Sequence, residues 1–317
     1  MISVIDLPDV KQTSAELTVL KTMAYFDIFN YPLSEKEIKN FLASPLTDQE
    51  FRSAIQRLSG ASMIFKIDQF YSLHGKGNSS IERLHGNRRA TKLLSKAISI
   101  GKFLNKFPYI RSVMVSGSLS KGYADEKADI DFFIITKANR LWIARTILHL
   151  FKKVTFLVGR QNLYCMNYFI DEKALEIPDK NLYTATEIVT LLPVCGRMAS
   201  DEFFRKNLWV KQFLPAYKNN SKFGVSDNSG LTKKLFEAVF NNRIGDRLDE
   251  FLYYWTTYRW QKKEYKKQRN SKGKVMNLIT GKHFAKSNPE AFQERIIERF
   301  ESKVQELKGQ LRTLVVK

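Results

Sequence analysis

Cysteine and histidine are scarce in this chain of 317 residues, which holds two cysteines and four histidines. Cys165 and Cys195 stand thirty residues apart, and neither belongs to a Cys-x-x-Cys motif or to a cluster with histidine. This pattern favours two free thiols and argues against a structural zinc site. The histidines are scattered along the chain and suggest no catalytic dyad.

Long apolar runs are also missing. No segment approaches the roughly 18 consecutive apolar residues of a membrane-spanning helix, and the first residues lack the basic-then-apolar layout of a signal peptide. The sequence shows no internal repeat and no heptad array, which excludes a solenoid and a coiled coil. We therefore expect a soluble, cytoplasmic protein with no membrane partner.

Acidic residues are few compared with basic ones: 32 aspartates and glutamates face 52 lysines and arginines, for a net charge of +20. Such an excess favours polyanionic partners, which means nucleic acid, nucleotides or an acidic surface. The densest positive stretch runs from Arg259 to Lys286 and carries ten basic residues against one acid, Glu264. With the aromatic residues Trp260 and Tyr265, it predicts a nucleic-acid contact; the alternative is a solvated, lysine-rich loop.

A glycine-serine turn follows a short apolar segment in the middle of the chain. The run Val113-Met-Val115 is typical of a buried strand, and it stops at Ser116-Gly-Ser118. Glycine allows the backbone to approach a ligand closely, and a helix after this turn would direct its unpaired N–H groups at that ligand. The turn therefore predicts a site for the phosphate tail of a nucleotide.

Two aspartates begin the next predicted strand, and ten residues separate the first of them from Ser118. Asp129-Ile-Asp131 runs directly into Phe132-Phe-Ile-Ile135, and because side chains alternate along a strand, both carboxylates are expected on one face. Two neighbouring carboxylates repel each other unless a cation lies between them. Mg²⁺ prefers oxygen ligands and keeps part of its coordination shell for substrate phosphates.

The turn, the spacing and the acid pair together resemble the signature of the DNA polymerase β-like nucleotidyltransferase superfamily, over roughly residues 82 to 180. The resemblance implies that Gly117 and Ser118 hold the β- and γ-phosphates of a nucleoside triphosphate. It also implies that Asp129 and Asp131 bind Mg²⁺ or Mn²⁺ and are catalytic. Lys121, three residues beyond Ser118, is expected to add a phosphate contact, although it is not part of the family motif.

The family usually adds a third carboxylate from a neighbouring strand, and here the sequence departs from the pattern. After a predicted helix from Arg140 to about Val154, the next strand candidate covers residues 162 to 171, and the expected acid falls near Asn167. An amide is a weaker metal ligand than a carboxylate. Asp171 has the same strand parity as Asn167 and is the preferred third catalytic acid, ahead of Glu176; the alternative is that neither reaches the pair.

The residues before and after this motif predict two further domains. Three helical segments and a hairpin turn at Asp68-Gln69 resemble a winged helix-turn-helix, with capping boxes at Ser34/Glu37 and Thr47/Glu50. The charge of this segment is nearly balanced, which is unfavourable for binding a polyanion. Two interpretations of the segment therefore remain open: it recognises a protein partner, or it binds nucleic acid. The expected fold is α+β: a winged-helix-like domain at 1–77, a small mixed sheet with flanking helices at 78–180, and a basic helical domain at 181–317.

The sequence as a whole predicts a Mg²⁺-dependent nucleotidyltransferase, in which an acceptor hydroxyl attacks the α-phosphate of a nucleoside triphosphate and pyrophosphate leaves. The acceptor, which could be nucleic acid, protein or a small molecule, is left open. Asn167 at the expected place of an acid supports an alternative, a nucleotide-binding regulator with little or no turnover. A modifier of cationic small molecules, of the aminoglycoside-adenylylating kind, is disfavoured by the basic C-terminal third.

Overall fold

The computed structural model describes residues 14–75, 78–156, 163–217, 231–269, 273, 275 and 277–315. The chain divides into two compact units, one made of residues 1–82, 211–218 and 296–317 and the other of residues 83–210 and 219–295. Among the described residues, every helix is too short or too polar to span a lipid bilayer.

The first unit combines three short helices with a small antiparallel sheet. Its elements are α1 (Ala15–Asp27), β1 (Leu33–Ser34), α2 (Glu35–Asn40), α3 (Asp48–Gly60), β2 (Phe65–Ile67) and β3 (Phe70–Ser72), with the strand order β1-β3-β2. Most of α11 (Phe292–Val315) belongs to this unit, where the ring of Phe300 lies 6.0 Å from that of Tyr25 in α1. The hairpin turn falls at Asp68-Gln69, as the sequence predicts.

Both predicted capping boxes are present. The Ser34 hydroxyl accepts a hydrogen bond from the Glu37 backbone N–H, and the Glu37 carboxylate accepts one from the Ser34 N–H in return. Thr47 and Glu50 repeat this exchange at the start of α3. Reciprocal capping satisfies two orphan donors at each helix start, which explains why the helices begin where the sequence predicts.

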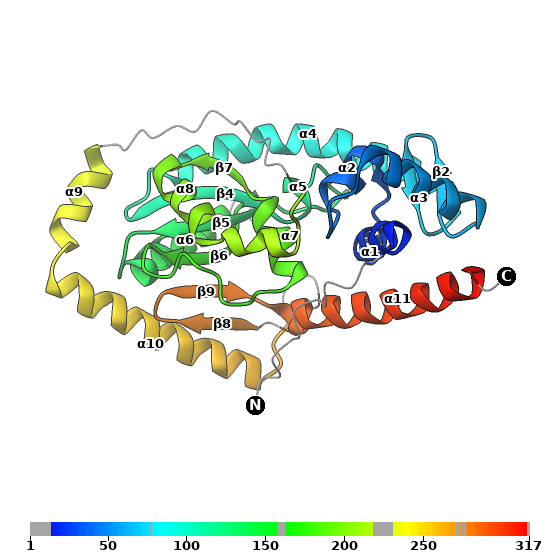
Figure 1. Ribbon diagram of the computed structural model, residues 1–317. Helices are drawn as coiled ribbons and strands as arrows, with labels where there is room; N and C mark the ends of the chain where they lie inside the picture. The colour runs from blue at the N-terminus through cyan, green and yellow to red at the C-terminus, as the bar shows by residue number, and fades with distance from the viewer. Residues whose placement is uncertain are drawn as a thin grey trace. The chain divides into compact units, whose positions relative to one another are not determined.

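The second unit is a six-stranded mixed sheet with helices on both faces (Figure 1). Its strands are β4 (Ile110–Ser116), β5 (Asp131–Thr136), β6 (Cys165–Asp171), β7 (Leu192–Cys195), β8 (Leu278–Gly281) and β9 (Phe284–Ser287). Its helices are α4 (Asn78–Leu104), α5 (Gly117–Ser120), α6 (Leu141–Phe156), α7 (Leu182–Val189), α8 (Arg197–Lys206), α9 (Leu231–Phe240) and α10 (Arg243–Tyr265). The α+β prediction, with a mixed sheet flanked by helices, is confirmed.

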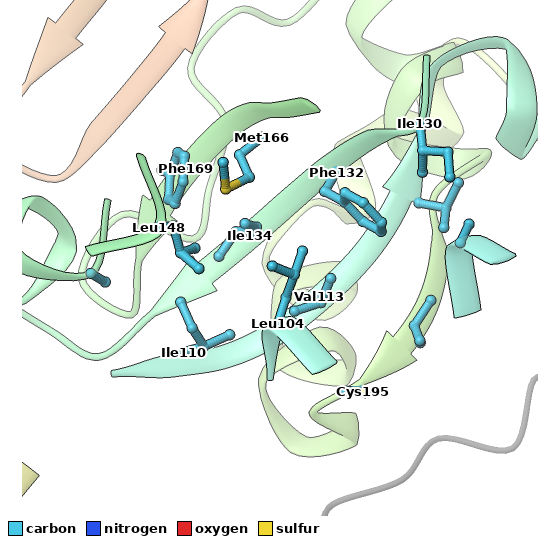
Figure 2. Packing of buried hydrophobic residues seen from close by; sticks show 14 of the residues in the cluster. Leu104, Ile110, Val113, Ile130, Phe132, Ile134, Leu148, Met166, Phe169 and Cys195 are labelled. Atoms are coloured by element: carbon cyan, nitrogen blue, oxygen red, sulfur yellow. The ribbon is translucent and has the colours of Figure 1, made fainter. Parts of the chain in front are cut away.

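The strand order is β7-β4-β5-β6-β9-β8, and of the five pairings only β5–β6 is parallel. Ile130, Phe132 and Ile134 point into the main core, which they share with Leu104 of α4 and Leu148 of α6 (Figure 2). Phe133 points the other way, because side chains alternate along a strand, and its ring lies 5.0 Å from that of Phe203 in α8. The two faces of β5 are therefore covered by different helices.

The expected boundary at residue 180, and with it a separate helical domain at 181–317, is wrong. β7 pairs with β4, and β9 pairs with β6 through Phe169↔Ala285, so segments beyond residue 180 complete the sheet that holds the motif. The reason is that a central strand needs partners on both sides, and the chain supplies them from distant segments. Short strands inside a mainly helical sequence leave little periodicity by which to recognise them.

Candidate active site

Gly117 lies directly against the carboxylate of Asp131. The two residues meet because Ser116, the last residue of β4, is paired with Asp131, the first residue of β5. Gly117 has a φ of +70°, and a Cβ atom added to it would stand 2.8 Å from Asp131 Oδ2. Both facts require glycine, because the conformation disfavours a side chain and the space beside the carboxylate is already filled.

Asp131 is the first residue of β5 and Asp129 lies two residues before it, on either side of the fully buried Ile130. Ile130 and Phe132 point into the core (Figure 2), so strand alternation directs Asp131 to the opposite face. The charges of both carboxylates affect the pKa of the same group, the thiol of Cys165. Burial raises the pKa of this thiol well above its usual range, and the charges of Asp131 and Asp129, with a hydrogen bond to Asp131, raise it further. The two acids therefore flank a common neighbour.

Lys121 reaches the turn but has a second partner there. Its Nζ donates to the carbonyl oxygen of Gly117 at 3.1 Å and to Glu187 Oε1 of α7 at 2.7 Å. Ser118 is exposed, and its carbonyl oxygen accepts hydrogen bonds from the backbone N–H groups of Lys121 and Tyr123. The structure thus gathers Gly117, Ser118 and Lys121 at the turn, and it adds Glu187, which the sequence analysis did not consider.

Asp171, the expected third acid, lies at the other end of the sheet. In the parallel β5–β6 pair, Asp131 faces Cys165, whereas Asp171 faces Thr136, five residues further along. At about 3.3 Å of rise per residue, this spacing is roughly 16 Å. Asp171 therefore does not join Asp129 and Asp131, and the expectation that it completes their site is wrong.

The contacts of Asp171 explain how a carboxyl group is accommodated in a fully buried position. Its Oδ2 accepts from the Asn139 backbone N–H at 2.9 Å and lies 2.9 Å from His283 Nδ1, and its Oδ1 accepts from the Lys173 N–H at 2.9 Å. A carboxylate that receives several hydrogen bonds ties the segments that donate them. Asp171 holds together the turn after β5, the turn after β6 and the β8–β9 turn.

Neither of the other sequence candidates replaces it. Asn167 falls where the β5–β6 register shifts, because Phe132 pairs with Met166 and Phe133 with Tyr168. Glu176 is exposed and ion-paired with Lys180 at 2.8 Å, and it lines a groove with Arg111, which stands at the opposite end of β4 from Gly117. The β6 residue that faces Asp131 is Cys165. The sequence contained one signal for this pairing: Cys165 lies near the start of the predicted strand at 162–171, as Asp131 lies near the start of its own strand.

A match to a known protein family covers this site. Residues 94–192 match the family model described as a nucleotidyltransferase domain. The chain contains a nucleotidyltransferase domain. The match runs from the middle of α4 to the first residue of β7, so the turn, the acid pair, Cys165 and Glu187 all lie within it. No curated protein and no solved structure gives a significant match.

The nucleotidyltransferase domain offers oxygen ligands for a divalent cation, but fewer of them than a closed metal site. Among the residues that the structure describes, no group of three or more histidine, cysteine and acidic side chains could hold a metal ion by itself. The carboxylates of Asp129 and Asp131, close to the turn at Gly117, nevertheless suit Mg²⁺, because Mg²⁺ is usually held by one or two carboxylates together with substrate phosphates. The residues present fit a cation that arrives with its nucleotide.

The structural role of Asp171 leads to a prediction. Replacing Asp171 with Ala is expected to lower the free energy of unfolding by about 3 kcal/mol, because two backbone N–H groups and His283 lose a buried partner. The measurement is chemical denaturation, combined with the transfer rate per folded molecule at low temperature. The rate should stay within a few fold of the wild-type rate.

The matched control is Glu172→Ala, which removes the neighbouring carboxylate. Glu172 is exposed and accepts one backbone hydrogen bond, from Ala138, so the expected loss is below about 1 kcal/mol. A stable Asp171→Ala protein without transfer activity would contradict the structural role and would indicate that Asp171 takes part in catalysis.

Proposed function

We propose that the nucleotidyltransferase domain joins a nucleoside monophosphate to an acceptor hydroxyl in a Mg²⁺- or Mn²⁺-dependent reaction that releases pyrophosphate. The observation that carries the proposal is the contact between Gly117 and Asp131, which puts the glycine-serine turn beside a carboxylate. The turn at Gly117 and Ser118 binds the β- and γ-phosphates of the triphosphate, and Lys121 adds a positive charge at its edge.

Asp129 and Asp131 hold the divalent cation in this proposal. A bound cation would neutralise charge on the phosphates and lower the pKa of the attacking hydroxyl. With Asp171 placed elsewhere, β6 contributes the Cys165 thiol at the level of the pair. Because burial raises the pKa of this thiol, it stays protonated at neutral pH and is no base. Proton acceptance from the acceptor hydroxyl therefore falls to the acid pair.

The alternative function, a nucleotide-binding regulator with little turnover, is favoured by two contacts. Cys165 stands where Asp131 meets β6, and Glu187 engages Lys121 at the turn. A thiol in place of a third carboxylate weakens metal binding, and an ion pair at the turn competes with phosphate. The regulator would keep the nucleotide and lose the reaction.

Incubation with each of the four triphosphates, labelled at the α-phosphate, separates the two functions. The enzyme is expected to release pyrophosphate and to transfer label to an acceptor when Mg²⁺ or Mn²⁺ is present, and chelation should stop both. Saturable binding without release would support the regulator. Absence of nucleotide binding would contradict both.

The acceptor and the partners belong to the same proposal. The first unit presents an exposed face of α3, with Gln49, Arg52 and Gln56, to a protein or nucleic-acid partner of a winged-helix-like domain. The basic stretch at 259–286 supports a nucleic-acid contact, and Arg259, Lys262 and Lys263 lie on the well-formed α10. Lys272 and Lys274 lie outside the described residues. Lys286 is engaged by Asp179 at 3.5 Å, which makes it a weaker candidate.

A further inference from the structure

A cationic groove of about 180 Å³ runs between α6 and α10, away from the acid pair. Its walls carry four cationic side chains and two tryptophans, and none of the described residues that line it is acidic. These six residues are Arg145, Lys153, Arg259, Lys263, Trp255 and Trp260. We call this the α6–α10 groove. It lies on the face of the sheet that α6 covers, whereas Asp131 points to the α8 face.

Arg145 is the most unusual residue of the α6–α10 groove. Its side chain is 6% exposed, and no hydrogen bond or ion pair joins it to another residue in the described part of the chain. Its guanidinium lies 5.6 Å from the centre of the Trp142 ring. Burial lowers its pKa to about 10, so it remains charged at neutral pH. A buried, unpaired charge destabilises a fold unless a counter-ion arrives, so Arg145 is built to receive an anion.

His149 provides a second polar group without a partner in the same groove. Its Nε2 is buried and makes no hydrogen bond with a described residue. Burial lowers the pKa of this imidazole well below its usual value, and the positive charge of Arg145 and of nearby lysines lowers it further. A neutral imidazole with Nε2 protonated can donate a hydrogen bond to an anionic oxygen without adding a fifth positive charge.

The two tryptophans add flat apolar surface to these donors. Trp255 is 44% exposed, and the Arg259 guanidinium lies 4.7 Å from its ring centre. The Lys263 ammonium lies 4.8 Å from the ring centre of Trp260. Proteins that bind single-stranded nucleic acid combine aromatic rings, on which unpaired bases stack, with cations that bind the phosphates. An acidic peptide would satisfy the cations but would leave the rings without a matching surface.

We propose that the α6–α10 groove binds single-stranded nucleic acid. Arg145, Arg259 and Lys263 contact the phosphodiester backbone, and bases stack on Trp255 and Trp260. The proposal goes beyond nucleotidyl transfer and needs no turnover, because the groove and the acid pair use different faces of the sheet. It commits to unpaired bases, since a duplex keeps its base faces covered.

The test measures binding of a fluorescein-labelled oligouridylate to the full chain by anisotropy, without triphosphate. We expect the double variant R259A/K263A to bind about tenfold more weakly or worse, and to lower the slope of log affinity against log salt by about 1.4. The matched control R243A/R247A removes equal charge from exposed positions on the same helix that do not line the groove. It should keep the wild-type affinity within about twofold.

Two further measurements address stacking and Arg145. The oligonucleotide should quench tryptophan fluorescence, and W255F/W260F should abolish this quenching, because the other two tryptophans, Trp142 and Trp209, are buried. Arg145→Met should weaken binding while leaving the melting temperature unchanged or higher, because it removes an unpaired buried charge. If Arg145→Met has a lower melting temperature than the wild type, Arg145 has a structural role. The binding of R259A/K263A compared with its control then tests whether the groove binds the oligonucleotide.

The proposal is overturned if both double variants weaken binding equally, if quenching is absent, or if duplex RNA or labelled polyglutamate binds as tightly as the single strand. Asp131→Asn serves as the variant that separates this proposal from the catalytic one. It should bind oligouridylate like the wild type. A protein that binds the oligonucleotide through the groove but transfers no nucleotide would refute the transfer reaction alone.

Discussion

Replacing Asp131 with Asn is expected to reduce nucleotidyl transfer by about a thousandfold or more while the protein stays folded. The carboxylate lies beside Gly117 at the edge of the turn, where the negative charge of a bound triphosphate must be matched by a cation. An amide is a poor ligand for Mg²⁺ and carries no charge. Asp129→Asn should act in the same direction, because both carboxylates lie beside Cys165.

The melting temperatures of these two variants provide a second test of the prediction. Asp129 and Asp131 repel each other when no cation is bound, so either substitution should leave the melting temperature of the metal-free protein unchanged or higher. We expect Mn²⁺ to raise the melting temperature of the wild type in the presence of a triphosphate analogue, and we expect no such increase in these variants. The assays are pyrophosphate release and thermal denaturation with and without Mn²⁺.

Asp125→Asn is the matched control for both substitutions. Asp125 is exposed in the loop between the turn and β5, and its carboxylate accepts a hydrogen bond from the Lys127 N–H. An asparagine oxygen can accept the same bond, so transfer should remain close to the wild-type rate. Full activity in both Asp129→Asn and Asp131→Asn would refute the proposed function.

Replacing Gly117 with Ala is expected to lower transfer about a hundredfold, because displacement of a catalytic group by about 1 Å has effects of that size. The new Cβ would stand 2.8 Å from Asp131 Oδ2, so the carboxylate must move. The substitution also forces alanine into the left-handed region, which destabilises by about 1–2 kcal/mol. The dissociation constant of the Mn²⁺–triphosphate complex should rise together with the loss of rate.

Gly122→Ala separates these two effects. Gly122 has a φ of +74°, close to that of Gly117, but no atom lies within 4 Å of its added Cβ. Alanine at either position therefore meets a similar backbone strain, and only Gly117→Ala crowds Asp131. We expect similar losses of melting temperature and unequal losses of activity. Equal activity losses would show that backbone strain, and not the contact with Asp131, controls the site.

The sequence predicted local features of the site well. The turn at Gly117 follows an apolar strand, and the acid pair precedes another, so neighbouring residues determine both. Strand alternation predicted the direction of Asp131 relative to Ile130 and Phe132, which the core confirms. The capping boxes at Ser34 and Thr47 were readable for the same reason, since both partners lie within four residues.

The sequence did not allow us to predict the register between neighbouring strands or the pairing of strands that are distant in the chain. The position of Asp171 along β6 fits a catalytic acid by parity, but its distance from Asp131 depends on how β6 slides against β5, and parity does not encode that offset. The pairing of β9 with β6 joins segments more than a hundred residues apart. The α6–α10 groove likewise combines Arg145 with Arg259, and only the fold brings these two arginines to one surface.

The attachment of β9 to β6 also determines how short an active fragment can be. A protein truncated where the family match ends, at residue 192, would expose the full backbone edge of β6, with unpaired backbone groups at Phe169 and Asp171. Open edges of this kind recruit strands from other molecules. The smallest well-behaved catalytic fragment must therefore extend through Ser287, far beyond the residues by which its family is recognised.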